Sequence, residues 1–164
     1  DPDGDPLCIL LMIDFYAIRC EQFDYLINLY KEWDSIKKLS LLPNFQFSIA
    51  LSLFLKHKNS NEEQILNEAS EKLQEALIMF PETLFNLTEK CGIEPDNQVK
   101  KCQFFNCDPQ KTQQPIHQLI LLYVGRSHML WKDKDVMFWL ENNVKTVISR
   151  VQNNDPLVNS CKER

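Results

Sequence analysis

The sequence predicts an all-α protein in which antiparallel helical hairpins stack as an α-solenoid of tetratricopeptide-like units, with about seven main helices. Apolar residues recur at helical spacing along most of the chain, and the alternation typical of strands is absent. Short breaks that contain proline, asparagine or glycine separate the helical segments. With 164 residues, 44% of them hydrophobic, the chain is long enough for one domain with its own core.

Four segments of the first half have helical spacing: 7–19, 22–34, 45–58 and 61–80. Asp5 is expected to be the N-cap of the first helix, with Pro6 in its first turn. Asn44 is expected to cap the third helix, after the break that precedes it. Pro81 is expected to end the fourth.

Three segments of the second half are also predicted to be helical: 82–91, 116–132 and 133–152. Gly92 is expected as the residue that closes the first of them, and Asp133 as the cap of the last. Residues 93–114 break every period, which predicts a long polar loop without regular structure. An eighth helix is expected to start at Asp155, where Asp-Pro-Leu repeats the opening of the first.

One local pattern favours tetratricopeptide-like packing over a generic helical bundle, which remains the alternative. In the fourth segment, four residues have the spacing that is typical of the second helix of a tetratricopeptide repeat: Ala69, Leu73, Ala76 and Pro81. In the third segment the first helix of the same unit is matched by Phe47, Ala50, Leu51 and Phe54. An insertion, KHKNSNEE, separates the two. The whole chain is expected to be one such domain, cut from a longer protein.

Composition excludes several classes of function. The net charge is −5 and no basic stripe is present, so direct binding to DNA is not expected. Three glycines are too few for a glycine-rich phosphate loop. No window is apolar enough for a transmembrane helix, so no membrane partner is expected. Six cysteines without a CxxC motif predict free thiols in a reducing compartment and no zinc site or other cofactor.

No set of residues in the sequence forms a coherent active site, so the chain is not expected to be an enzyme. Ser127 and His128 are neighbours on a predicted helix, where their side chains point about 100° apart and cannot act as nucleophile and base. Asp14 is a lone carboxylate in an apolar helix. It is expected to pair with a neighbouring arginine or amide, or to face a groove.

The segment GRSHMLWK (125–132) is the most informative stretch, because arginine and tryptophan are typical of binding hot spots. A recognition edge for a partner protein is therefore predicted at Arg126, His128, Trp131 and Lys132. The alternative is that Gly125 lets a neighbouring helix approach and Trp131 fills the core. Phe104 and Phe105 are a second candidate; they either contact a partner or pin the polar loop to the helices.

These residues also carry a family resemblance that covers essentially the whole chain. The matching segments are DPLCILLMIDFYAIR (5–19), 25–33, LPNFQFS (42–48), EALIMFP (75–81), QFF (103–105), LYVGRSHMLWK (122–132) and WLENNV (139–144). With them the chain resembles the central part of the transcription factor 25 family, whose fungal members are called ribosome quality control complex subunit 1. It departs from the family pattern in the insertion at 56–64 and in the polar segments 93–101 and 106–114.

The resemblance implies a non-enzymatic scaffold of the ribosome-associated quality control complex. Its implied partners are a ubiquitin ligase of the Listerin type, ubiquitin and the 60S ribosome–nascent chain complex. An AAA unfoldase is implied indirectly or through other regions of the protein. The implied role is to promote ubiquitination and extraction of the nascent chain, in the cytosol and also in the nucleus. The alternative is a transcriptional repressor that acts through protein–protein contacts.

Overall fold

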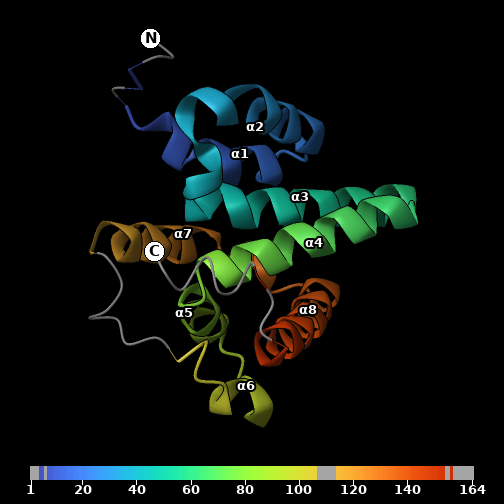
Figure 1. The fold of residues 1–164 in the computed structure, drawn as a ribbon. Coiled ribbons are helices and arrows are strands. Elements are labelled where there is room, and N and C mark those ends of the chain that lie inside the picture. Colours follow the sequence, from blue (N-terminus) through green and yellow to red (C-terminus); the bar gives the residue numbers. More distant parts are fainter. Residues whose placement is uncertain (1–3, 6, 107–113, 154–155, 157–164) are drawn as a thin grey trace. The chain divides into compact units, whose positions relative to one another are not determined.

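The computed structural model describes residues 4–5, 7–106, 114–153 and 156 (Figure 1). In that part of the chain, regular structure consists of eight α-helices and two short 3-10 helices, with no strand, which confirms the all-α prediction. The chain divides into two compact units, residues 1–72 and residues 73–164. A single tetratricopeptide-like domain over 1–164, and the stacking of its hairpins into a solenoid, stay predictions.

The first unit contains η1 (Ile9–Leu11), α1 (Ile13–Arg19), α2 (Phe23–Lys37), η2 (Leu39–Leu41), α3 (Pro43–Ser60) and the beginning of α4 (Glu63–Met79). Helices α1, α2 and α3 pack against one another. Helix α3 is the most deeply placed, because every residue from Pro43 to Phe54 is buried. Its first part is buried around the whole circumference, with Asn44, Gln46, Ser48 and Ser52 buried among the apolar residues.

Two predictions about helix starts in this unit are wrong. The first α-helix begins at Ile13 and not at residue 7, because Cys8 adopts a left-handed conformation (φ 52°) that an α-helix cannot continue through. The Asp5 carboxylate still caps, but it caps η1, accepting from the backbone N–H groups of Ile9 (2.7 Å) and Leu10 (3.1 Å). Helix α3 begins at Pro43, so Asn44 lies inside it and is no cap.

Asn44 belongs instead to a buried polar cluster that ties the beginning of the chain to α3. Asp14 is fully buried, and its carboxylate accepts from Asn44 Nδ2 (3.1 Å) and Ser48 Oγ (2.7 Å). Asn44 Nδ2 also donates to the carbonyl oxygen of Leu10 (3.0 Å). The expected amide partner of Asp14 is therefore confirmed, and the hydrogen bonds offset the cost of burying its charge.

The second unit contains the rest of α4, α5 (Thr83–Cys91), α6 (Asn97–Lys101), α7 (Gln114–Trp131) and α8 (Lys134–Gln152). Helix α5 packs along α7, and α6 contacts α8. Both predicted termini are confirmed: Gly92 closes α5 at φ 71°, and the Asp133 carboxylate accepts from the N–H groups of Asp135 and Val136. The prediction that residues 93–114 lack regular structure is wrong for residues 97–101, which form α6. The eighth helix predicted from Asp155 lies outside the described residues.

The tetratricopeptide-like pattern correctly identifies buried positions. Ala69, Leu73 and Ala76 of α4 are fully buried, and this helix ends two residues before Pro81. The predicted insertion does not form a separate loop, because α3 continues through Ser60. Asn61 is the C-cap of α3; its backbone is left-handed (φ 56°), and its N–H donates to the carbonyl oxygen of His57 (2.7 Å). No described helix is long and apolar enough to cross a membrane.

Candidate protein-binding surface on helix α7

Helix α7 carries the segment GRSHMLW, and its packing decides which of those side chains can meet a partner. The helix buries one face, made of Ile120, Tyr123, Val124, Ser127 and Trp131. These positions recur at intervals of one, three and four residues, as expected for one side of an α-helix. The neighbouring helix α5 packs along α7.

Trp131 is part of the core and does not form a recognition edge, so its predicted role in partner binding is wrong for this conformation. Its side chain is fully buried, its Nε1–H donates to Tyr123 Oη (2.9 Å), and its ring stacks on Trp139 of α8. The two ring centroids are 6.3 Å apart with an interplanar angle of 9°. The alternative, in which Trp131 fills the core, therefore describes this residue.

Phe104 and Phe105, the second candidate for partner binding, differ in how far they are buried. Phe105 is 1% exposed, so it pins the polar segment to the second unit and is not available to a partner. Phe104 is half-buried and packs edge-on against Phe105, with 5.3 Å between the ring centroids. Buried Phe105 thus anchors this segment.

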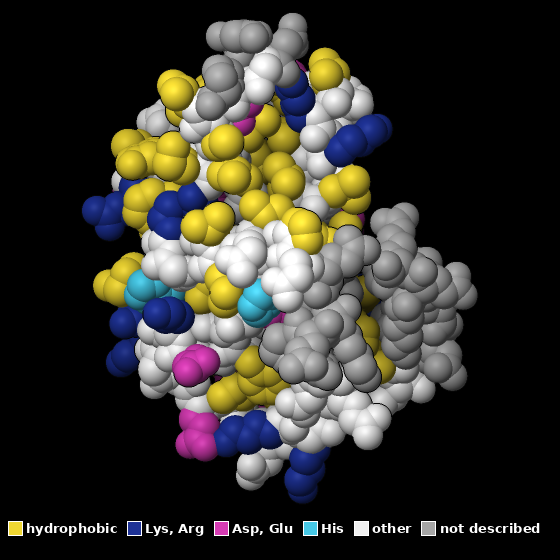
Figure 2. Space-filling view, turned by 90° about the vertical axis from the view of Figure 1, so that its left-hand side faces the viewer, with side chains coloured by type: hydrophobic (Ala, Val, Ile, Leu, Met, Phe, Trp, Pro, Cys, Tyr) yellow, Lys and Arg dark blue, Asp and Glu magenta, His cyan; other side chains and the backbone are white. Residues whose placement is uncertain are grey.

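The opposite side of α7 presents a surface that the sequence analysis missed. We call it the α7 surface; its members are Leu121, Leu122, Gly125, Met129 and Lys132, all exposed. The exposed fractions are 40% for Leu121, 58% for Leu122 and 58% for Met129. Figure 2 shows one face of the molecule on which hydrophobic side chains lie beside histidine and basic side chains. Large apolar side chains grouped on one helix face are typical of a protein-binding site.

Gly125 lies in the middle of the α7 surface, and it does not serve the approach of another described helix. Apart from its own helix turn, a Cβ atom built on Gly125 meets no atom of the described residues within 4 Å. The interpretation that this glycine admits a neighbouring helix is therefore wrong for the helices that the structure describes. Because Gly125 has no side chain, the helix backbone is accessible between the three exposed apolar side chains.

The predicted basic residues lie at the C-terminal half of α7. His128 is half-buried, and its Nδ1 lies 3.1 Å from the carbonyl oxygens of Val124 and Gly125. Cys91 of α5 donates to the carbonyl oxygen of His128 (3.4 Å). Burial raises the pKa of the Cys91 thiol, and the charge of Lys132 partly counteracts this.

Arg126 is half-buried and lies on the flank of α7, between its buried and exposed sides. Of the predicted edge, Lys132 is thus exposed, Arg126 and His128 are partly exposed, and Trp131 is enclosed. Ser127 is fully buried, so it offers no nucleophile to a substrate. Within the described ranges, no three His, Cys, Asp or Glu side chains gather as a metal site requires.

Comparisons with known proteins match the chain over its whole length. The family model described as transcriptional repressor TCF25 covers residues 1–164. Proteins named ribosome quality control complex subunit TCF25 are 44% identical in Mus musculus and 42% identical in Homo sapiens, each over 100% of the chain. The protein of that name from Dictyostelium discoideum is 31% identical over 98%. The chain spans 25% of each of these relatives. No solved structure matches the chain with statistical significance.

Proposed function

The chain belongs to the family described as transcriptional repressor TCF25, and we propose that it is a non-enzymatic adaptor within a ribosome quality control complex. The observation that carries this proposal is the similarity along the full chain to relatives that are named subunits of that complex. The chain spans about a quarter of those relatives, so the proposal concerns the contribution of this helical part.

The proposed partners are the Listerin-type ubiquitin ligase and ubiquitin, on a stalled 60S ribosome–nascent chain complex. The chain would promote ubiquitination of the nascent chain and, through other regions or other subunits, its extraction by an AAA unfoldase. No covalent step is required of the chain, because holding ligase and ubiquitin in a fixed orientation is enough to select the attacking lysine. This work takes place in the cytosol, with the nucleus as a second location.

Within this proposal, the α7 surface is the docking face for the ligase. Leu122 and Met129 each leave more than half of their side chain in water, so a partner that covers them gains apolar burial. Burying a fully exposed side chain of this kind contributes about 1.5–3 kcal/mol, so covering the exposed 58% contributes roughly 1–2 kcal/mol. Lys132 adds positive charge at one end of the surface. A partner that covers the surface is therefore expected to be apolar at its centre and acidic at that end.

A reconstituted ubiquitination assay on stalled 60S complexes tests the proposal. The test variant carries Leu122→Asp and Met129→Asp, which place two charges on the α7 surface without touching the core. The matched control is Ile36→Asp, which changes a similarly exposed apolar residue (66%) on α2. We expect the double variant to lose ligase binding and change the linkage pattern while the control keeps both. Unchanged binding and linkage in the double variant would contradict this use of the surface.

The description of the family model favours one other function, a transcriptional repressor that acts through protein–protein contacts. A net charge of −5 gives no support for direct contact with DNA, so this role would also depend on a protein partner. Fractionation of cells separates the two functions. The adaptor cosediments with 60S subunits, and the repressor is retained with chromatin after the ribosomes are removed.

A further inference from the structure

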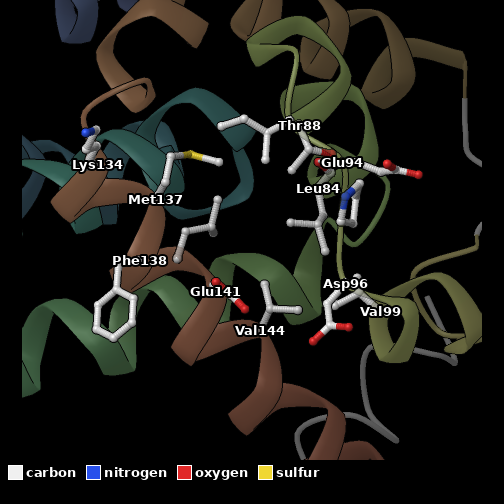
Figure 3. A pocket seen from close by; sticks show the side chains of 13 residues that line it. Leu84, Thr88, Glu94, Asp96, Val99, Lys134, Met137, Phe138, Glu141 and Val144 are labelled. Carbon is white, nitrogen blue, oxygen red and sulfur yellow. Dashed lines mark hydrogen bonds between the residues drawn. The ribbon is translucent and has the colours of Figure 1, made fainter.

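The second unit contains a cavity that lies outside the α7 surface. Its volume is about 430 Å³, and it is lined by residues of α5, of α6 with the segment that leads into it, and of α8 (Figure 3). Its buried lining residues are mostly apolar: Leu84, Val99, Leu140 and Val144, with Thr88 as the polar one. A cavity of this size, with apolar walls and a few polar groups, is typical of a binding site.

The mouth of the cavity combines exposed apolar side chains with carboxylates. Phe138 is 66% exposed and Ile93 is 38% exposed, although both line the cavity. Its acidic lining residues are Glu94, Asp96 and Glu141, whereas Lys134 is the basic one. Figure 3 shows Lys134 at one end of the cavity and Glu94 and Asp96 at the other. The cavity is therefore apolar inside and negatively charged at one end.

Two lysines of the chain bind these carboxylates, but neither lysine lines the cavity. Lys100 pairs with Glu94, which lowers the pKa of that carboxyl group, and Lys145 pairs with Glu141 at 2.9 Å. Both ion pairs are exposed and are therefore weak. The Asp96 side chain makes no capping hydrogen bond at the start of α6, although Asp96 precedes that helix. Lys145 also interacts electrostatically with Asp96, so a cation brought by a ligand would share Asp96 and Glu141 with this exposed lysine.

We propose that this cavity binds a peptide segment of a partner protein that presents a large apolar side chain next to an arginine or lysine. The apolar side chain fills the space against Leu84 and Val144, and Phe138 covers it at the mouth. The adjacent cation lies against Asp96 and Glu141. This chemistry differs from that of the α7 surface, which presents positive charge and suits an acidic partner. The proposal therefore does not depend on the proposed function.

The four methionines provide separate reporters for the two surfaces. Met137 lines the cavity, Met129 belongs to the α7 surface, and Met12 and Met79 lie elsewhere. With 13C-labelled methionine methyl groups, each site gives its own NMR signal in the 164-residue chain. The probes are three amidated peptides: GSLRFKSG, its acidic counterpart GSLEFESG, and its polar counterpart GSSRSKSG.

We expect GSLRFKSG to shift the Met137 signal in a saturable way and to leave the Met129 signal in place. The acidic and polar counterparts should shift Met137 much less, because each lacks one half of the proposed recognition. Asp96→Asn should weaken binding of GSLRFKSG at least threefold. Glu89→Gln is the matched control: it removes one charge from an exposed position on α5 that does not line the cavity, and should leave the affinity unchanged.

Three results would overturn the proposal. The first is no shift of Met137 at millimolar GSLRFKSG, and the second is an equal response to the acidic peptide. The third is a shift of Met129 in place of Met137, which would move the binding to the α7 surface. Loss of ligase binding through Leu122→Asp would not bear on the cavity, so the two proposals fail separately.

Discussion

Replacing Trp131 by alanine should strongly destabilise the chain, although a partner-binding role would leave its stability nearly unchanged. Trp131 is fully buried, donates a hydrogen bond to Tyr123 at 2.9 Å and stacks on Trp139. Removing a buried tryptophan costs about 3–5 kcal/mol, which already includes the cavity left behind. Trp131→Phe keeps an aromatic ring against Trp139 but loses the N–H donor, so its cost should be about 1–2 kcal/mol.

Urea unfolding followed by far-ultraviolet circular dichroism measures these costs. For a slope of about 2 kcal/mol per molar urea, Trp131→Ala should lower the unfolding midpoint by roughly 1.5–2.5 M. Lys132→Ala is the control, since this exposed side chain should change the stability by less than about 0.5 kcal/mol. A loss below about 1 kcal/mol for Trp131→Ala would refute its placement in the core between α7 and α8.

Three other predictions follow from contacts described above. Gly125→Ala should stabilise the chain by about 0.5–1 kcal/mol, because the added Cβ meets open space on a helix. Gly92→Ala should destabilise the chain by about 1 kcal/mol, because Gly92 has a φ of 71°. Thermal unfolding compares the two variants. Ser48→Ala should cost about 1–3 kcal/mol, because buried Asp14 loses a donor at 2.7 Å, and the exposed Ser35→Ala should cost little in the same urea titration. Burial raises the pKa of Cys91, so the Cys91 thiolate forms at higher pH in the folded chain than in the unfolded chain. The pH midpoint for alkylation of Cys91 by iodoacetamide should therefore be higher in the folded chain than in the urea-unfolded chain. Equal midpoints would contradict this burial.

The helices could be predicted because their apolar periodicity agrees with the caps and breaks around them. Gly92 and Asp133 end and begin helices where the sequence indicates, and the spacing of Ala69, Leu73 and Ala76 identifies a buried face. The start of α1 could not be predicted, because nothing in the sequence marks Cys8 as a left-handed residue. Asn44 reads as a cap, and only its contact with Asp14, thirty residues earlier, shows why it is buried.

The candidate site was harder to predict, because GRSHMLWK does not reveal which side of its helix faces the core. Both sides carry large apolar residues, Trp131 on one and Met129 on the other, and the packing of α5 and α8 decides between them. Helix α6 has five residues, too few for a periodic signal, and depends on tertiary contacts such as buried Val99. The cavity is built from three separate segments, so no local pattern could indicate it.

The binding affinity between the purified chain and the Listerin-type ligase tests the central proposal most directly. Isothermal titration calorimetry would compare the unaltered chain with Leu122→Asp and with Ile36→Asp, which lie on different units but have similar exposure. If the α7 surface is the docking face, Leu122→Asp raises the dissociation constant at least tenfold, equivalent to about 1.4 kcal/mol, and Ile36→Asp leaves it unchanged. Equal affinities for all three proteins, each with an unchanged circular dichroism spectrum, would contradict the account.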